Sequence, residues 1–193
     1  MNKTTTNVLL VGVGGQGIIL VSDMLSEGLV RAGYDVKMSE IHGLAQRGGS
    51  VTTQIKFGDR VYSPIIGTAQ ADVLVSFEKI EALRYLGHLK PEGTLIVNDH
   101  EIFPLPVLIG AEKYPDNISD ILRQRVKYLT FFNAFQIADR LGNSRAQNIV
   151  VLGTIIKALG LEKVKWAEIM KQFIPPTLYE INIRALEAGL NFS

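Results

Sequence analysis

The sequence predicts an α/β fold with a mixed, mostly parallel sheet and a helical C-terminal part. Three observations predict it. A buried apolar run leads through a glycine turn into a helix at the start, strands and helices alternate again in the middle, and the last part of the chain shows helical spacing. With 193 residues, 47% of them hydrophobic, the chain fits one compact domain better than two.

The first unit is a strand, a glycine turn and a helix. Residues 8–11 are apolar at odd and even positions alike, which is typical of a central parallel strand covered by helices on both faces. Residues 12–17 form the glycine turn. Residues 18–32 then carry apolar side chains at helical spacing until Gly33 ends the helix.

The alternation of strands and helices is interrupted once. Residues 34–40 are a second candidate strand, but a glycine-rich loop follows at residues 42–49, where a simple βαβ unit would place a helix. Residues 51–57 alternate between apolar and polar, and a Gly-Asp pair separates them from residues 61–62, which predicts an antiparallel hairpin. We therefore expect a mixed sheet.

The regular alternation then resumes. The pattern predicts a strand at residues 72–77, a helix at 78–87, a turn at 91–93, a strand at 94–97, an extended proline segment at 103–106, a short helix at 119–124 and a strand at 126–132. Residues 133–190 supply three or four helices, the last of them after Pro175 and Pro176.

The glycine turn is the first candidate site. Gly12, Gly14 and Gly17 match the GxGxxG pattern of dinucleotide-binding turns, and Glu40 ends the next strand about 20 residues further on, where such proteins place a ribose-binding acid. Glycines let the backbone approach an anion, and the unpaired amides of a helix N-terminus stabilise negative charge. The same glycines also suit a tight turn packed closely against a helix, so the pattern leaves both interpretations open. Gly15 opens the turn further than packing requires, which favours an approaching ligand or partner backbone.

The glycine-rich loop is the second candidate site. Arg47 stands beside Gly48 and Gly49, and a guanidinium held there can bind an anion in bidentate fashion with little steric obstruction. His42 and Gln46 are further hydrogen-bonding groups in the same loop. The alternative is an ordinary surface loop in which Arg47 is solvated.

Two further sets of polar residues have plain structural interpretations. Glu78 and Glu81 stand at the start of a predicted helix, where acidic side chains cap the helix and interact favourably with its dipole. Tyr179, Asn182 and Arg184 are polar positions among apolar ones on the last helix, and we expect them at the surface.

Composition and missing motifs exclude several classes of function. Twenty basic and 19 acidic residues give a formal charge of +1, which leaves no basic excess for nucleic acid. The absence of cysteine removes thiol nucleophiles and any iron-sulfur cluster held by this chain alone, and the three histidines lack metal-ligand spacing. No phosphate-loop or nucleophile-elbow motif occurs. A short polar N-terminus and the lack of an apolar stretch of about 18 residues predict a cytoplasmic protein that does not enter the membrane.

Four segments together resemble a known family. They are GVGGQGI at residues 12–18, HGLAQRGGSV at 42–51, YSPII at 62–66 and ADVLVSFEKIEALR at 71–84. They are similar to the gamma-type domain of 2-oxoacid:ferredoxin oxidoreductases, in particular those of the indolepyruvate type, and the similarity extends over nearly the whole chain. The resemblance implies a single gamma-type catalytic domain over residues 1–193 with a three-layer α/β/α sandwich fold.

The resemblance also implies an activity. The family decarboxylates a 2-oxoacid oxidatively, here an arylpyruvate such as indolepyruvate, giving the acyl-CoA and carbon dioxide and reducing ferredoxin. It uses thiamine diphosphate, Mg²⁺ and iron-sulfur clusters, with CoA as co-substrate. Because this chain has no cysteine and no GDG-type diphosphate motif, we expect those cofactors on a separate large alpha subunit and no metal on this chain. Alone it should be inactive, and its exposed partner surface could pair two copies into a homodimer.

Within such an enzyme the two glycine segments are the candidate site. We expect catalytic contacts from Arg47 and His42, and cofactor contacts that face the thiamine centre or the path of CoA from Gly12, Gly14, Gly15, Gln16, Gly17, Gly48 and Gly49. A free-standing Rossmann-like NAD(P)-binding oxidoreductase and a non-catalytic assembly scaffold remain as alternatives. The loop that replaces the usual second helix weighs against the NAD(P) enzyme.

Overall fold

The structure is a computed structural model that describes residues 5–42 and 49–192. A six-stranded sheet with the strand order β2-β3-β1-β4-β5-β6 forms its centre. The strands are β1 Thr6–Val13, β2 Asp35–His42, β3 Ser50–Gly58, β4 Ala71–Ser76, β5 Leu89–Asn98 and β6 Tyr128–Phe132. The helices are α1 Ile18–Arg31, α2 Lys79–Tyr85, α3 Leu105–Leu108, α4 Ile118–Arg125, α5 Ala134–Arg140, α6 Gln147–Leu159, α7 Trp166–Phe173 and α8 Pro176–Leu190, with short 3₁₀ turns η1 Leu86–His88 and η2 Ser144–Ala146.

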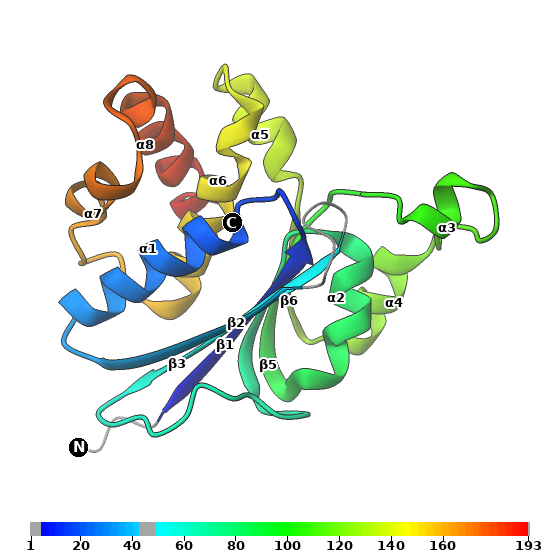
Figure 1. Cartoon of the computed structure of the whole chain (residues 1–193), viewed down its shortest axis with the longest axis horizontal. Helices are drawn as coiled ribbons and strands as arrows, with labels where there is room; N and C mark the ends of the chain where they lie inside the picture. The colour runs from blue at the N-terminus through cyan, green and yellow to red at the C-terminus, as the bar shows by residue number, and fades with distance from the viewer. Residues whose placement is uncertain (1–4, 43–48, 193) are drawn as a thin grey trace.

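The sheet lies between two helical layers, which confirms the expected three-layer α/β/α fold (Figure 1). Helices α1, α6, α7 and α8 cover one face, and α2 and α4 cover the other. Strands β1, β4, β5 and β6 pair in parallel, whereas β3 pairs antiparallel with both β1 and β2. The sheet is therefore mixed and mostly parallel, as the sequence predicts.

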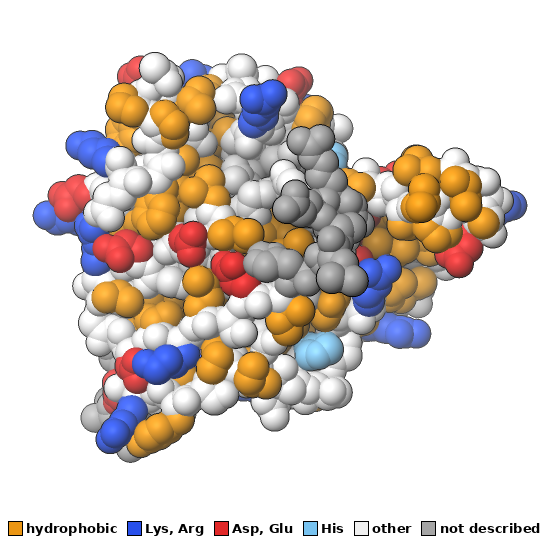
Figure 2. Space-filling view, viewed as in Figure 1, with side chains coloured by type: hydrophobic (Ala, Val, Ile, Leu, Met, Phe, Trp, Pro, Cys, Tyr) orange, Lys and Arg blue, Asp and Glu red, His pale blue; other side chains and the backbone are white. Residues whose placement is uncertain are grey.

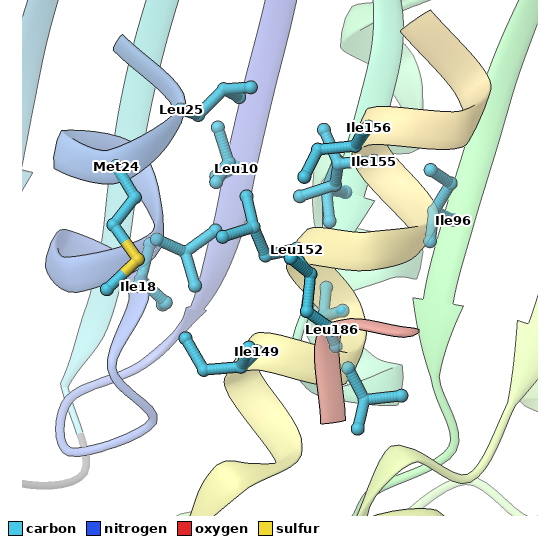
Figure 3. Close-up of a cluster of buried hydrophobic side chains, with 14 of the residues drawn as sticks. Leu10, Ile18, Met24, Leu25, Ile96, Ile149, Leu152, Ile155, Ile156 and Leu186 are labelled. Carbon is cyan, nitrogen blue, oxygen red and sulfur yellow. The ribbon is translucent and has the colours of Figure 1, made fainter. Parts of the chain in front are cut away.

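The larger core lies under the C-terminal helices. Figure 3 shows Leu10 of β1 and Ile96 of β5 facing Leu152 and Ile155 of α6, with Ile18 of α1 beside them. Helix α6 is buried along residues 148–156, so it packs between the sheet and α8. Because the helix is buried on every side, its apolar residues are not confined to one face.

Helices α6 and α8 cross with their backbones in contact. A Cβ atom on Gly189 would lie 2.0 Å from the carbonyl oxygen of Val150, and one on Gly153 would lie 2.4 Å from that of Leu186. Only glycine fits at these two positions, because any side chain would have to displace main chain rather than a flexible side chain.

The hairpin predicted at residues 61–62 is wrong. The antiparallel partners of β3 are β2 and β1, and residues 59–70 form neither helix nor strand. The amide of Val61 donates to Asp35 Oδ2 at 2.8 Å, and that of Ile66 donates to Gln54 Oε1 at 2.5 Å. Val61 and Ile66 are apolar because they are buried against the sheet, not because they belong to it.

Two other local expectations are also corrected. The turn predicted at residues 91–93 lies inside β5, which begins at Leu89 and accommodates the extra residues through a register shift against β4. The proline segment predicted to be extended instead contains α3, with Pro104 at its N-cap, because proline is tolerated in the first turn of a helix. In the described ranges, 5–42 and 49–192, no helix is long and apolar enough to span a bilayer.

Candidate functional site at the carboxyl edge of the sheet

The parallel strands place several connecting segments at one edge of the sheet. The chain leaves β1 towards α1 on one face and leaves β4 towards α2 on the other. The gap between the carboxyl ends of β1 and β4 is therefore a topological switch point, the place where open α/β sheets bind their ligands. The glycine turn, residues 12–17, lies at this point.

The side chain of Gln16 bridges the switch point. Its Oε1 accepts the amide hydrogen of Val13 at 2.8 Å, and its Nε2 donates to the carbonyl oxygen of Phe77 at 2.7 Å. The carboxamide thus ties the end of β1 to the residue that follows β4. Since both ends of the side chain are engaged within the protein, Gln16 shapes the turn instead of offering its carboxamide to a ligand.

The turn contains glycines for two different reasons. A Cβ on Gly12 would lie 2.7 Å from Gln16 Oε1, and one on Gly17 would lie 2.4 Å from Asn148 Nδ2, so these glycines make room for the chain's own side chains. Gly15 has a φ of +100° and is exposed, with no described atom within 4 Å of a Cβ placed on it. The packing interpretation holds for Gly12 and Gly17, whereas Gly15 leaves open space at the turn.

A hydrogen bond joins the glycine turn to the end of the glycine-rich loop. The amide of Gly14 donates to the carbonyl oxygen of Gly49 at 2.9 Å, directly before β3 begins. Gly49, the last residue of the glycine-rich segment, is therefore a neighbour of the glycine turn. Gln46, Arg47 and Gly48 lie outside the described residues. The structure describes His42 only as the last residue of β2.

The start of α1 lies against a cavity of about 380 Å³. The N-cap of this helix is Gly17, which has no side chain to cap it, and the first turn contains no acidic residue. The cavity is lined by residues from α1, η2, α6 and the α7–α8 junction, namely Leu20, Asn143, Arg145, Ala146, Asn148, Phe173, Ile174, Pro175, Leu178 and Asn182. The positive end of the helix dipole favours an anion in this region.

The asparagines in that cavity were not recognised from the sequence as site residues. Asn148 is 8% exposed, and its side chain lies next to the glycine turn, where a Cβ on Gly17 would come within 2.4 Å of its Nδ2. Asn182, expected at the surface, is 6% exposed, and its Nδ2 donates to the carbonyl oxygen of Leu178 at 2.7 Å. Arg184 is exposed as expected, and the half-buried Tyr179 donates its hydroxyl to the carbonyl oxygen of Ala167 at 2.9 Å. The periodicity of α8 alone cannot reveal that the Asn182 side chain turns inward at a helix junction.

Glu78 caps α2, as predicted, but it is also completely buried. Its Oε2 accepts the amides of Ile80 at 2.7 Å and Glu81 at 3.0 Å. Its Oε1 accepts the hydroxyl of Tyr114 at 2.6 Å and the amide of Ile102 at 3.3 Å. Burial and the Glu78 carboxylate raise the pKa of Tyr114 well above its ordinary value, so the phenol remains a donor to Glu78.

Glu81 lies in the first turn of α2, but its side chain does not cap the helix. It is buried, and its Oε2 accepts the hydroxyl of Ser50 at 2.6 Å while Oε1 pairs with Arg84 at 2.6 Å. Burial raises the pKa of Glu81, against the opposing effects of Ser50 and Arg84. Ser50 directly follows Gly49, so a buried carboxyl group supports the first residue of β3 beside the glycine-rich loop.

Asn98 completes the polar contacts at this edge. Its Oδ1 accepts the amide of Ala134 at 2.9 Å, and its Nδ2 donates to the carbonyl oxygen of Phe77 at 3.3 Å. The carbonyl of Phe77 therefore receives both Gln16 and Asn98. These contacts tie the ends of β1, β4 and β5 to the start of α5.

Glu40 does not occupy the position of a ribose-binding acid. It pairs with Thr53 of β3, which in turn pairs with Leu10 of β1, so a whole strand separates Glu40 from the glycine turn. Two strand spacings amount to about 10 Å. Burial and the charge of Glu40 raise the pKa of Asp23 on α1. The electrostatic effect of Glu40 is therefore on a residue of helix α1. This placement disfavours the dinucleotide-binding alternative.

The residues present do not fit the redox cofactors. The chain contains no cysteine to bind an iron-sulfur cluster. Over residues 5–42 and 49–192, no group of three or more His, Asp or Glu side chains is arranged to bind a metal ion. What this edge of the sheet offers is a glycine turn that leads into the N-terminus of α1, with buried polar side chains behind it.

The comparison with protein families decides what kind of protein this is. Residues 7–192 match the model of the family described as "Pyruvate ferredoxin/flavodoxin oxidoreductase". The chain belongs to this family. The pyruvate ferredoxin/flavodoxin oxidoreductase domain thus accounts for the whole sheet and both helical layers.

Individual relatives of this oxidoreductase family are similar over nearly the whole of this chain. The indolepyruvate oxidoreductase subunit IorB of Thermococcus kodakarensis is 36% identical over 190 residues, which cover 95% of this chain and 94% of that protein. Among solved structures, a keto/oxoacid ferredoxin oxidoreductase gamma subunit from Geobacter sulfurreducens has a TM-score of 0.68 at 23% identity, over 95% of each chain. The 2-oxoglutarate:ferredoxin oxidoreductase from Magnetococcus marinus has a TM-score of 0.77 at 18% identity, over 98% of this chain but 31% of that one. At these identities the two structures bear on the fold alone.

Proposed function

We propose that this chain is the small, non-redox subunit of a cytoplasmic, heteromeric 2-oxoacid:ferredoxin oxidoreductase that acts on arylpyruvates such as indolepyruvate. The single observation that carries the proposal is the 36% identity, over nearly the full length of both chains, to a protein named as an indolepyruvate oxidoreductase subunit. Residues 1–193 are then one gamma-type domain. The reaction is the oxidative decarboxylation of the 2-oxoacid to its acyl-CoA, with ferredoxin as electron acceptor.

The division of labour between subunits follows from what this chain lacks. Without cysteine it cannot hold the clusters that pass electrons to ferredoxin. We therefore assign thiamine diphosphate, Mg²⁺ and the iron-sulfur clusters to a large alpha subunit. The role left to this chain is to bind and position anionic groups next to that centre.

The candidate residues for this role remain those of the two glycine segments. The backbone of Gly12, Gly14, Gly15 and Gly17, with Gln16 between them, lies at the switch point directly before α1, whose N-cap is Gly17. That arrangement suits a phosphate or carboxylate of CoA or of the substrate. Arg47 and His42, with Gly48 and Gly49, are proposed to contact the same anionic groups from the loop.

The proposal is tested on the complex, purified anaerobically. The tagged chain should co-purify with one large subunit that carries iron and thiamine diphosphate, and the complex should reduce a dye in the presence of both indolepyruvate and CoA. Full activity of the large subunit alone would instead make this chain an assembly scaffold. Binding of NADH to this chain alone would favour the dinucleotide-binding alternative.

Arg47→Ala separates a role in the reaction from a role in folding. We expect it to lower the turnover of the complex by about tenfold or more, as expected when a charged contact to a reacting anion is lost, while the melting temperature stays within about 2 °C. Arg184→Ala, on an exposed residue of α8, is the control and should leave both unchanged. Unchanged turnover in Arg47→Ala would remove this residue from the proposal.

A further inference from the structure

Two carboxyl groups are buried in the helical layer that contains α2. On the face of the molecule shown in Figure 2, acidic and basic side chains lie scattered over the surface. Over residues 5–42 and 49–192, the buried charged residues are only Glu78 and Glu81, which are 0% and 2% exposed. Glu78 caps α2, whereas the side chain of Glu81 reaches from α2 to Ser50, the first residue of β3.

Ser50 is held from the α2 side by two side chains. Its hydroxyl donates to Glu81 Oε2 at 2.6 Å and lies 3.3 Å from the hydroxyl of Tyr85, which is also on α2. The other carboxyl oxygen of Glu81, Oε1, pairs with Arg84 at 2.6 Å. Because both oxygens are engaged, the carboxyl group cannot turn away from Ser50 without losing a contact. The first residue of β3, where a strand would otherwise fray, is therefore fixed to α2.

From Ser50 the contacts continue to the glycine turn. Ser50 pairs with Val13, the last residue of β1, in the antiparallel ladder between β1 and β3. The preceding residue, Gly49, accepts the amide of Gly14 at 2.9 Å. The ladder thus extends by one hydrogen bond into the turn that follows β1. A shift of Ser50 would move the acceptor of the Gly14 amide, and the start of the turn with it.

The position of the Glu81 carboxyl group costs free energy. Burial raises the pKa of Glu81, and the charge of Glu78 acts in the same direction against the contacts with Ser50 and Arg84. The cap of α2 does not need this carboxyl group, because Glu78 provides the cap. Buried groups with a shifted pKa gather preferentially at functional sites. The contact with β3, next to the glycine turn, is therefore the place to look for the role of Glu81.

We propose that Glu81, acting through Ser50, is a positioning residue that holds the glycine turn in the conformation that binds an anionic group. This inference rests on the proposed function, in which the turn binds a phosphate or carboxylate of CoA or of the 2-oxoacid. Glu81 acts from behind the turn and does not touch the ligand, since its side chain is buried against β3. A turn fixed in advance loses less conformational freedom when the anion binds.

The test measures the KM values for CoA and for indolepyruvate on the complex. Gly15→Asp is the reference variant, because it adds a carboxylate at the exposed, open position of the turn and should raise the KM of the ligand whose anion binds there. Ser50→Ala and Glu81→Ala should raise the KM of that same ligand by about fivefold or more, with kcat unchanged. The double variant should not exceed the larger single effect, because both changes remove one contact.

Two controls separate positioning from a general loss of stability. Glu81→Gln keeps an acceptor for Ser50 and should retain the KM of the unmodified complex. Ile155→Val removes a methyl group from the core under α6, which lowers stability away from the turn and should leave both KM values unchanged. As a readout without activity, amide hydrogen exchange at Gly14 in the purified full chain should accelerate in Ser50→Ala relative to the amides of α6.

The outcomes separate this inference from the proposed function. If Gly15→Asp raises one KM while Ser50→Ala and Glu81→Ala raise neither, the positioning role is overturned and the proposed function stands. If Gly15→Asp also leaves both KM values unchanged, the turn does not bind the anion and both proposals fall. An additive double variant, or a raised KM in Ile155→Val, would overturn action through Ser50. Unchanged exchange at Gly14 in Ser50→Ala would overturn it even for a complex that does not oxidise indolepyruvate.

Discussion

The two helical layers of this protein are built in different ways. On one face, α6 and α8 meet backbone to backbone over an apolar core that also includes α1 and α7. On the other face, α2 and α4 cover a smaller core, and buried carboxylates hold the ends of the segments there. The first layer gains stability from close packing, whereas the second uses hydrogen bonds to fix the segment between Ile102 and Tyr114 in position.

The largest expected effect breaks the packed layer. Gly189→Val places a Cβ 2.0 Å from the carbonyl oxygen of Val150, so the two helices must separate. We expect a loss of about 3 kcal/mol or more in the free energy of unfolding, measured by urea denaturation. Gly87→Ala is the control, because no described atom lies within 4 Å of its Cβ position. A loss below about 1 kcal/mol for Gly189→Val would contradict the tight crossing.

A smaller effect is expected in the hydrogen-bonded layer. Glu78→Ala uncaps α2 and leaves Tyr114 without its acceptor, which should cost about 2 kcal/mol in the free energy of unfolding. Because Glu78 also accepts hydrogen bonds from Ile102 and Tyr114, amide hydrogen exchange should accelerate from residue 102 to residue 114. The exposed Glu162→Ala should change neither quantity. Faster exchange in α8 rather than in residues 102–114 would contradict this division between the layers.

The smallest effect concerns pH. Burial raises the pKa of Glu81 in the folded protein, so its protonated form is favoured by folding. Its contribution to stability is therefore fully present below the ordinary value of 4.5 and is lost as the pH rises through the folded pKa. Glu81→Gln retains an acceptor for Ser50 and does not titrate. The variant should become more stable relative to the unmodified protein as the pH rises from 4 to 8, measured by denaturation at each pH; a constant difference would contradict the assignment.

The parts of the fold that the sequence predicts well are those set by local pattern. The apolar run of β1, its glycine turn and the spacing of α1 predict that unit to within about two residues. The helices after residue 133 follow from periodicity in the same way. The three layers were expected from the family resemblance, and the structure confirms them.

The errors arise where distant contacts determine the structure. Val61 and Ile66 are apolar because they pack on the sheet as a connection, which local alternation cannot distinguish from a strand. Asn182 and Glu81 are buried because a helix junction and β3 enclose them, and neither contact is visible along one element. The glycine turn was predicted as a candidate site, but the bridge made by Gln16 and the nearby Asn148 depend on segments far away in the chain.

The hydrogen bond between Gly14 and Gly49 has a consequence for how sequence change can affect this region. It joins two peptide groups, so the distance between the turn and the loop is set without any side chain. Substitution of side chains around it can alter charge or shape but leaves this link in place, and only proline at position 14 would remove the donor. The placement of Gly49 beside the glycine turn is therefore insulated from most single mutations, while the side chains around this link are free to diversify.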